Sequence, residues 1–283
     1  MEQGTGAIKD IKDKRDYQFK EIAKSLPPFD WDKGYDIEEI IGKKLKVKDQ
    51  DGSSSCGGQA WATYGQVLDP DSEEKSAKFI YSHTNAPGGG SAGRTNCEFV
   101  IKKGWGDESK CPSYENGEPP SEAFMINKTD IPAEAFTDAL LDKGLSYANV
   151  GSNIEDIAQA IKANKGCILG IAGKNNGTWR TKFPKPEPSL VGSWNHWVYA
   201  GKALTIGGKK YIGFINSWGE STGEKGWQYI GEDYIKNDWV WSVWTMVYNF
   251  PLFKFTKTLK FGMINSEVKE LQKRLGVIQT GFF

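Results

Sequence analysis

A run of apolar residues at helical spacing follows the cysteine at position 56. Its members recur three or four positions apart, as on one face of a helix: Ala60, Trp61, Tyr64, Val67 and Leu68. Asp69-Pro70 ends the run, because proline cannot continue a helix. Residues 49–55, before the run, are Asp, Gln, Gly and Ser, which favour a loop. The pattern predicts a helix that begins at or next to Cys56.

A second amphipathic helix is predicted to start after Asn153, because asparagine is a favoured N-cap residue. One face of this segment is apolar: Ile154, Ile157, Ala158 and Ile161. Gly166 lies just beyond it, where glycine commonly ends a helix. A further helix is expected over residues 95–103, after the glycine-rich loop 85–93.

The second half of the chain is rich in short β-type runs. Residues 167–171, Cys-Ile-Leu-Gly-Ile, predict a buried strand. Further strands are expected where β-branched and aromatic residues alternate with turns: 196–200, 210–215, 227–230 and 243–248. Helices in the first half and strands in the second predict a fold of the α+β class.

The two ends of the chain differ from its middle. Residues 1–28 are polar and charged up to Leu26-Pro27-Pro28, which favours an extended N-terminal arm. Such an arm is too short to bury a core of its own, so we expect no folded inhibitory domain and a chain that is active with the arm attached. After Pro251, residues 251–283 carry a separate short amphipathic pattern.

Length and charge narrow the classes of function. A chain of 283 residues corresponds to about two domains, or to one large domain with two lobes. Lys and Arg number 36 and Asp and Glu also 36, so the formal net charge is 0. Without a basic surplus, nucleic acid and anionic membrane surfaces are not expected partners. No signal peptide is visible and no apolar run is long enough to span a membrane; we expect a soluble protein and leave its location open.

Three polar residues occur in an order that suggests nucleophilic catalysis. Cys56 is expected at a helix N-terminus, where a thiolate is stabilised. Of the two histidines, His83 has no evident partner, whereas His196 begins a predicted strand and is followed 20 residues later by Asn216. The order Cys, His, Asn allows a nucleophile, a general base and a group that orients the base.

The surrounding motifs resemble those of papain-like cysteine peptidases, in a microbial or phage-type variant. Gln50 precedes Cys56 by six residues, as the oxyanion-hole glutamine does in that family. A second family pattern is Asn-Ser-Trp-Gly followed by Gly-Glu-x-Gly and an aromatic residue. The chain matches it with Asn-Ser-Trp-Gly at residues 216–219 and Gly-Glu-Lys-Gly-Trp at residues 223–227. The resemblance covers about residues 27–250, and the distance from cysteine to histidine also matches it.

The resemblance implies a two-lobed α+β fold with the active site in the cleft between the lobes. A helical lobe would span about residues 29–150 and a β-barrel-like lobe about 151–250. Cys56, His196, Asn216 and Gln50 would be catalytic. Residues expected to contact substrate or to shield the site are Gly88, Gly89, Gly90, Asn195 and Trp218. The implied activity is hydrolysis of a peptide or protein, by a cysteine endopeptidase, through a thiolate nucleophile and an acyl-enzyme intermediate.

Two departures from the family leave alternatives open. Cys56 is followed by Gly57-Gly58, where the family usually has Trp-Ala, and Ser53 stands where it often has a disulfide cysteine. A catalytically silent binding module is therefore one alternative. Residues 251–283 resemble the start of a peptidoglycan-binding repeat, so an endopeptidase or amidase acting on peptidoglycan is another. A disulfide between Cys97 and Cys111 stays open, and no metal or other cofactor is expected, because no pair of cysteines has metal-ligand spacing with the histidines.

Overall fold

Helix α3 (Cys56–Leu68) begins at the predicted cysteine and runs through the interior of the chain. Every residue of α3 except Gln66 is buried. It packs against α4 (Ala77–Thr84) and α5 (Gly93–Lys103), the second of which confirms the expected helix over 95–103. The glycines after Cys56 permit this packing, because a Cβ on Gly58 would lie 2.5 Å from the carbonyl oxygen of Ala77.

The structure is a computed structural model that describes residues 5–14, 16–24, 26–142, 146–247, 262–264 and 268. The chain divides into two compact units, Met1–Tyr248 and Asn249–Phe283. Apart from residues 262–264 and 268, the expected peptidoglycan-binding-like segment 251–283 lies outside the described residues.

Among its described residues the first unit has six further α-helices and one 3-10 helix, Thr178–Arg180. Five of them are short: α1 (Phe19–Ala23), α2 (Ile37–Ile41), α6 (Glu122–Ile126), α7 (Ala133–Ala139) and α9 (Glu232–Lys236). The sixth, α8 (Ile154–Asn164), is the helix predicted after Asn153. The Asn153 side chain caps it by accepting a hydrogen bond of 2.9 Å from the backbone N–H of Asp156.

A seven-stranded sheet makes up the β-rich part of the described chain. Six strands lie side by side in the order β4 (Tyr147–Asn149), β9 (Val240–Met246), β5 (Cys167–Gly173), β6 (Trp194–Ile206), β7 (Lys209–Ile215) and β8 (Trp227–Gly231). The seventh, β2 (Tyr35–Asp36), pairs with β6, and every pairing in this sheet is antiparallel. The predicted strands are present, but within the described residues the sheet stays open and forms no barrel. Strands β2 and β4 come from the half of the chain expected to be helical.

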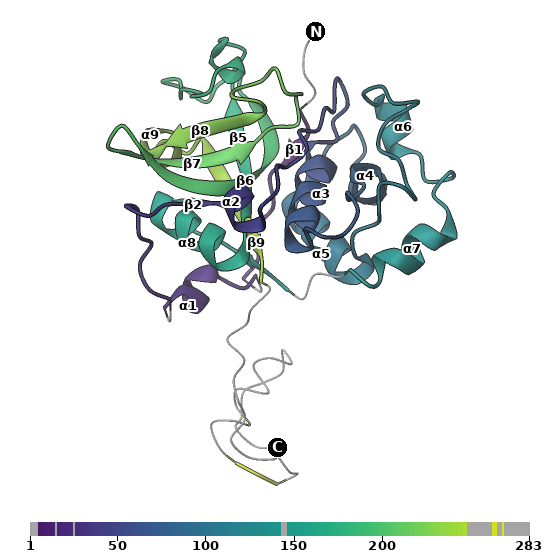
Figure 1. The fold of residues 1–283 in the computed structure, drawn as a ribbon, viewed down its shortest axis with the longest axis horizontal. Helices are drawn as coiled ribbons and strands as arrows, with labels where there is room; N and C mark the ends of the chain where they lie inside the picture. Colours follow the sequence, from purple (N-terminus) through teal and green to yellow (C-terminus); the bar gives the residue numbers. More distant parts are fainter. Residues whose placement is uncertain are drawn as a thin grey trace. The chain divides into compact units, whose positions relative to one another are not determined.

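Aromatic residues join α3 to the sheet. The Trp61 and Trp197 rings pack edge to face, with centroids 5.5 Å apart. The Tyr64 hydroxyl donates a 2.6 Å hydrogen bond to the carbonyl oxygen of Gly166, just before β5. Figure 1 shows the result, with α3 to α7 gathered on one side of the first unit and the strands on the other.

The N-terminal arm is more ordered than its composition suggests. Strand β1 (Ala7–Ile8) pairs in parallel with β3 (Ser91–Ala92), and Figure 1 shows β1 between the helices and the large sheet. Farther along, the backbone N–H of Asn149, in β4, donates a hydrogen bond of 2.8 Å to the carbonyl oxygen of Tyr17. The arm therefore touches both parts of the fold.

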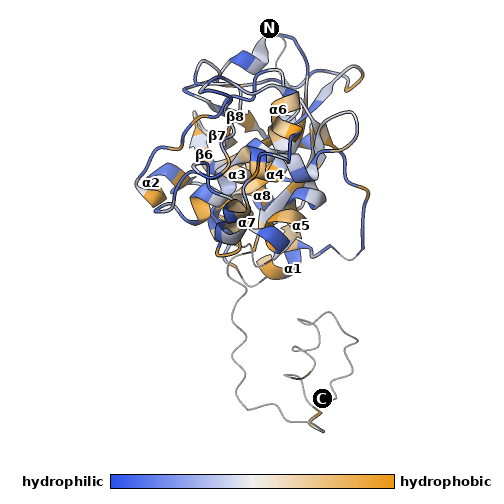
Figure 2. Cartoon of the chain, turned by 90° about the vertical axis from the view of Figure 1, so that its right-hand side faces the viewer, coloured by the Kyte–Doolittle hydropathy of each residue, from blue (hydrophilic) through white to orange (hydrophobic). Residues whose placement is uncertain are grey.

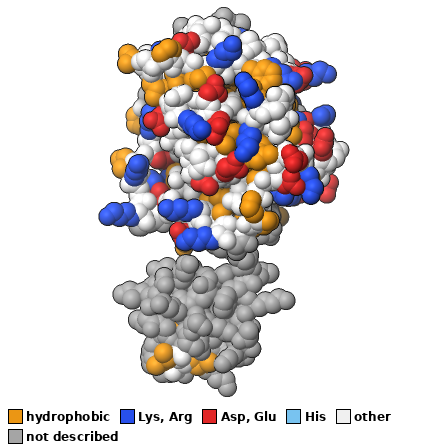
Figure 3. All heavy atoms as spheres, turned by 90° about the vertical axis from the view of Figure 1, so that its left-hand side faces the viewer, with side chains coloured by type: hydrophobic (Ala, Val, Ile, Leu, Met, Phe, Trp, Pro, Cys, Tyr) orange, Lys and Arg blue, Asp and Glu red, His pale blue; other side chains and the backbone are white. Residues whose placement is uncertain are grey.

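The surface carries mixed charge, in keeping with the balance of basic and acidic residues. On the face in Figure 3, Lys and Arg side chains alternate with Asp and Glu. Figure 2 shows hydrophilic residues in the connecting loops and apolar residues along the helices. No helix in the described part of the chain is long and apolar enough to cross a membrane.

Candidate active site

The sheet brings His196 and Asn216 together. His196 is the third residue of β6, and Asn216 directly follows β7, the antiparallel neighbour of β6. The Asn216 side-chain oxygen Oδ1 lies 2.9 Å from His196 Nε2 and accepts a second hydrogen bond, of 2.8 Å, from the backbone N–H of Ser217. Because a backbone N–H can only donate, Oδ1 must face both groups. His196 Nε2 therefore carries the proton, and in the neutral ring Nδ1 is the basic nitrogen.

Trp218 covers this hydrogen bond. Its ring centroid lies 4.8 Å from that of His196, at an interplanar angle of 34°. Both side chains are buried. The indole ring therefore packs against the imidazole, in the position from which Trp218 is expected to shield the hydrogen bond from water.

Cys56 lies beside the start of β6. The backbone N–H of Trp197, the residue that follows His196, lies near its sulfur and acts to lower the pKa of the Cys56 thiol. The side chain is fully buried at the first position of α3. The structure thus brings the expected nucleophile to the strand that carries the expected base.

Gln50 is tied to the motif that contains Asn216. The Gln50 backbone N–H donates a hydrogen bond of 2.9 Å to the Ser217 carbonyl oxygen. The Gln50 side-chain oxygen Oε1 accepts one of 2.6 Å from the Ser217 hydroxyl, and Nε2 donates one of 2.7 Å to the Ser53 carbonyl oxygen. Its amide nitrogen is therefore held on the side of the loop that leads to Cys56.

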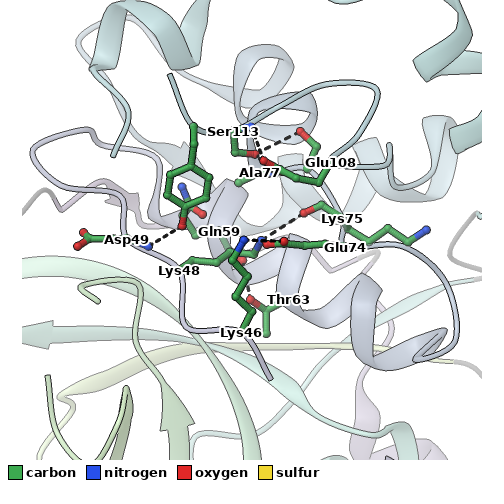
Figure 4. A network of polar contacts seen from close by, with 12 residues as sticks. Lys46, Lys48, Asp49, Gln59, Thr63, Glu74, Lys75, Ala77, Glu108 and Ser113 are labelled. Carbon is green, nitrogen blue, oxygen red and sulfur yellow. Dashed lines mark hydrogen bonds and ion pairs between the residues drawn. The ribbon is translucent and has the colours of Figure 1, made fainter. Parts of the chain in front are cut away.

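Ion pairs from one exposed and one buried lysine hold the segment before Gln50 (Figure 4). The ammonium groups of Lys46 and Lys48 lie 2.9 and 2.5 Å from the Glu74 carboxylate. Burial alone would raise the pKa of Glu74, but the two lysines lower it. The Asp49 backbone N–H donates a hydrogen bond of 3.0 Å to the Tyr114 hydroxyl. These contacts fix the approach of the chain to Gln50.

The glycine loop binds the N-terminal arm in this structure. Gly88, Gly89 and Gly90 all have positive φ, of 89°, 93° and 81°. The Ser91 backbone N–H donates a hydrogen bond of 2.8 Å to the Gly6 carbonyl oxygen. A Cβ on Gly90 would lie 2.3 Å from that oxygen, so only glycine allows this approach. Of the three glycines, Gly90 thus lies against the arm, whereas a Cβ on Gly89 would meet Ser54 and Glu122.

The Gly6 backbone also lies near the candidate nucleophile, since its N–H acts to lower the pKa of the Cys56 thiol. Arm residues farther on are anchored to α5. The Asp10 carboxylate accepts hydrogen bonds from the Arg94 backbone N–H at 2.9 Å and from Trp244 Nε1 at 3.1 Å, and Asp16 pairs with the Arg94 guanidinium at 2.5 Å. The arm needs no core of its own, because it docks on the folded chain. The expected activity of the chain with the arm attached therefore requires that substrate displace the arm.

Burial sets the protonation of the covered pair. Loss of water raises the pKa of Cys56 to about 12, although hydrogen bonds from the Trp197 and Gly6 backbone act in the other direction. Burial likewise lowers the pKa of His196 to about 4, against the effect of its bond to Asn216. A thiolate was expected from the helix N-terminus and an adjacent imidazolium. With the arm in place, the structure instead favours a neutral thiol and a neutral imidazole.

No family model and no curated protein matches this sequence. Several solved structures share its fold. Xylellain, a cysteine protease from Xylella fastidiosa, matches with a TM-score of 0.69 and 22% identity, over 88% of this chain and 97% of that one. Bromelain from Ananas comosus matches with a TM-score of 0.58 and 18% identity, over 76% of this chain and 99% of that one. The chain has the papain-like cysteine protease fold. The proform of Amb a 11, a ragweed pollen cysteine protease, also shares this papain-like fold. It matches with a TM-score of 0.62 and 21% identity, over 81% of this chain and 68% of that one.

One residue expected to contact substrate lies directly before His196. Asn195 precedes His196 in β6, so its half-buried side chain points to the opposite face of the strand. All four cysteines are free, so Cys97 and Cys111 form no disulfide here.

Sequence patterns did not single out Ser217 or Gln228, which contact Gln50 and Asn216. For Gln228 a signal existed, because a polar residue stands within a run predicted to be a strand.

Proposed function

We propose that this chain is a cysteine endopeptidase that hydrolyses peptide bonds of peptides or proteins through an acyl-enzyme intermediate. One observation carries the proposal: a histidine oriented by Asn216 and shielded by Trp218 lies on the strand whose next backbone N–H contacts Cys56. The papain-like fold supports it, as the matched structures include proteins named cysteine proteases.

In the proposed first step, the substrate displaces the arm and His196 Nδ1 takes the Cys56 proton. The sulfur then attacks the carbonyl carbon of the scissile bond. The Gln50 amide and the Cys56 backbone N–H donate hydrogen bonds to the oxyanion that forms. The C–N bond breaks as the imidazolium gives its proton to the leaving amine, so a thioester and a free amine result.

In the second step, His196 removes a proton from water, and the hydroxide attacks the thioester carbonyl. The C–S bond breaks, the carboxylic acid leaves, and the proton returns to the Cys56–His196 pair. Asn216 acts throughout by keeping Nδ1, and not Nε2, available. The proposed steps use water, side chains of this chain and the Cys56 backbone N–H.

The glycines after Cys56 do not favour the silent alternative. A Cβ on Gly57 would lie 2.1 Å from the Ser91 hydroxyl, and one on Gly58 would meet α4. Their small size serves the packing of α3, and Cys56 still occupies the first position of the helix. The peptidoglycan alternative depends on residues 251–283, and no contact of the described residues favours it.

The test is covalent labelling by a thiol-reactive peptide epoxide, together with hydrolysis of a peptide library. Cys56→Ala should abolish labelling and turnover but keep the thermal unfolding temperature close to that of the wild type. Cys167→Ala, which changes a cysteine in β5, is the matched control and should keep both activities. Turnover by well-folded Cys56→Ala protein would overturn the proposal.

A further inference from the structure

Gln228 links the candidate active site to the backbone of a neighbouring loop. It is the second residue of β8, and its side chain is fully buried. Its oxygen Oε1 accepts a hydrogen bond of 2.7 Å from Asn216 Nδ2. Its nitrogen Nε2 donates two hydrogen bonds of 2.9 Å, to the carbonyl oxygens of Trp179 and Thr181.

Backbone groups at both ends fix the direction of these bonds. The Trp179 and Thr181 carbonyl oxygens can only accept, so Gln228 must turn its NH₂ group towards them and its oxygen towards Asn216. Asn216 must then use its NH₂ group on Gln228 and its oxygen on His196. Donation runs in one direction, from His196 through Asn216 and Gln228 to the loop.

Such a chain favours a positive charge at its first member. Each amide presents its oxygen, the negative end of its dipole, towards His196, and hydrogen bonds in series polarise one another. The imidazolium of the proposed mechanism would therefore be stabilised and held in orientation. A neutral imidazole gains less, because its N–H is the weaker donor.

We propose that Gln228 is a positioning residue of the peptidase, which holds the Asn216 amide so that His196 is oriented and its protonated form is stabilised. This role rests on the proposed function. It differs from a purely structural role, in which Gln228 would only attach the loop at residues 179–181 to β8. The two roles predict different effects on catalysis.

Gln228→Met separates them by removing the hydrogen bonds with little change in volume. We expect kcat to fall about 10- to 100-fold, with KM within about twofold of the wild type. In an Asn216→Ala background the same substitution should change kcat by less than about twofold, because its route to His196 is gone. Tyr229→Phe, at the next position of β8, is the matched control and should keep kcat.

Gln228→Glu gives a second readout. Burial and the Trp179 and Thr181 carbonyl oxygens keep a carboxyl group at this position protonated, so it can donate to one of them and still accept from Asn216. We therefore expect kcat of Gln228→Glu to exceed that of Gln228→Met at least about fivefold, although one bond to the loop is lost. A structural role would make kcat follow the unfolding temperature of each variant. Equal kcat of Gln228→Glu and Gln228→Met, or equal effects of Gln228→Met with and without Asn216, would overturn the inference. A wild-type chain without labelling or turnover would overturn the proposed function, and this role with it.

Discussion

At the scale of single residues, small changes of geometry decide which groups can take part in catalysis. The amide of Asn216 is useful only in one of its two orientations, and the Ser217 backbone N–H requires that orientation. The Gln50 amide is fixed by the Ser53 carbonyl oxygen, which can only accept and so faces Nε2, while Oε1 accepts from the Ser217 hydroxyl. In the proposed mechanism Nε2 also donates to the oxyanion.

Replacing Gln50 should therefore affect the rate more than substrate binding. Loss of one oxyanion donor costs about 2.7–4 kcal/mol in the transition state, so Gln50→Ala should lower kcat about 10²- to 10³-fold with little change in KM. Steady-state kinetics on a peptide substrate measure both constants. Gln66→Ala, at the other end of α3, removes a comparable amide and should leave kcat unchanged. A raised KM with unchanged kcat would make Gln50 a substrate-binding residue instead.

At the scale of elements, the N-terminal arm is the feature that most changes the interpretation of the site. Strand β1 pairs with β3, and the Gly6 backbone contacts the Cys56 sulfur. The Asp10 carboxylate accepts from the backbone N–H of Arg94, in the first turn of α5, whose own N-cap residue makes no side-chain hydrogen bond. We expect an arm that is held in this way to exclude substrate from the proposed site until it leaves.

Weakening the anchors of the arm should activate the full-length chain. Asp10→Ala combined with Asp16→Ala removes the contacts to Arg94 and Trp244, and we expect Cys56 to be labelled at least about tenfold faster near neutral pH, equivalent to about 1.4 kcal/mol. Lys12→Ala, at an exposed position between them, is the control. With the arm docked, burial raises the pKa of Cys56 to about 12, so labelling of the wild type should still increase in alkaline solution. Equal rates in all three chains would instead support the sequence-based expectation that the chain is active with the arm attached.

At the scale of the whole molecule, buried ionisable groups make stability depend on pH. Lys202 lies 2.9 Å from both Asp36 and Glu38 and joins the segment of β2 and α2 to β6. Although burial acts in the opposite direction, Lys202 and neighbouring donors lower the pKa of Glu38. Its contribution to stability is present above the unfolded value of 4.5 and is lost as the pH falls below that value.

As the pH falls, the buried His196 should lower the stability of the fold at a higher pH than the carboxylates do. Its pKa is about 4 in the folded chain and 6.5 when unperturbed, so the unfolded chain binds the proton first as the pH falls. Between about pH 7 and about pH 5 this should lower the free energy of unfolding by about 2 kcal/mol. Urea unfolding at the two pH values measures the loss. His196→Gln should make this drop in the free energy of unfolding smaller, whereas His83→Gln should keep the part that comes from His196. An equal drop in the wild type and in His196→Gln would show that His196 is not its source.

Local patterns in the sequence determined a large part of the fold. The spacing of apolar residues after Cys56 and after Asn153 requires helices there, since only a helix gathers such positions on one face. Alternation and β-branched residues likewise indicated the strands from residue 167 onwards. The order of Cys56, His196 and Asn216, with the motif around Trp218, indicated the candidate chemistry, because those residue types suit it at any distance along the chain.

Tertiary structure alone decided which groups meet. The contacts of Gly6 with Cys56 and of Gln228 with Asn216 join segments with no common local pattern, and so does the pairing of β2 with β6. The protonation of Cys56 was also beyond the sequence: a helix N-terminus favours the thiolate, whereas burial under the arm opposes it, and only the folded chain shows that burial is the larger effect. Desolvation depends on all atoms packed around a group, and those atoms come from every part of the chain.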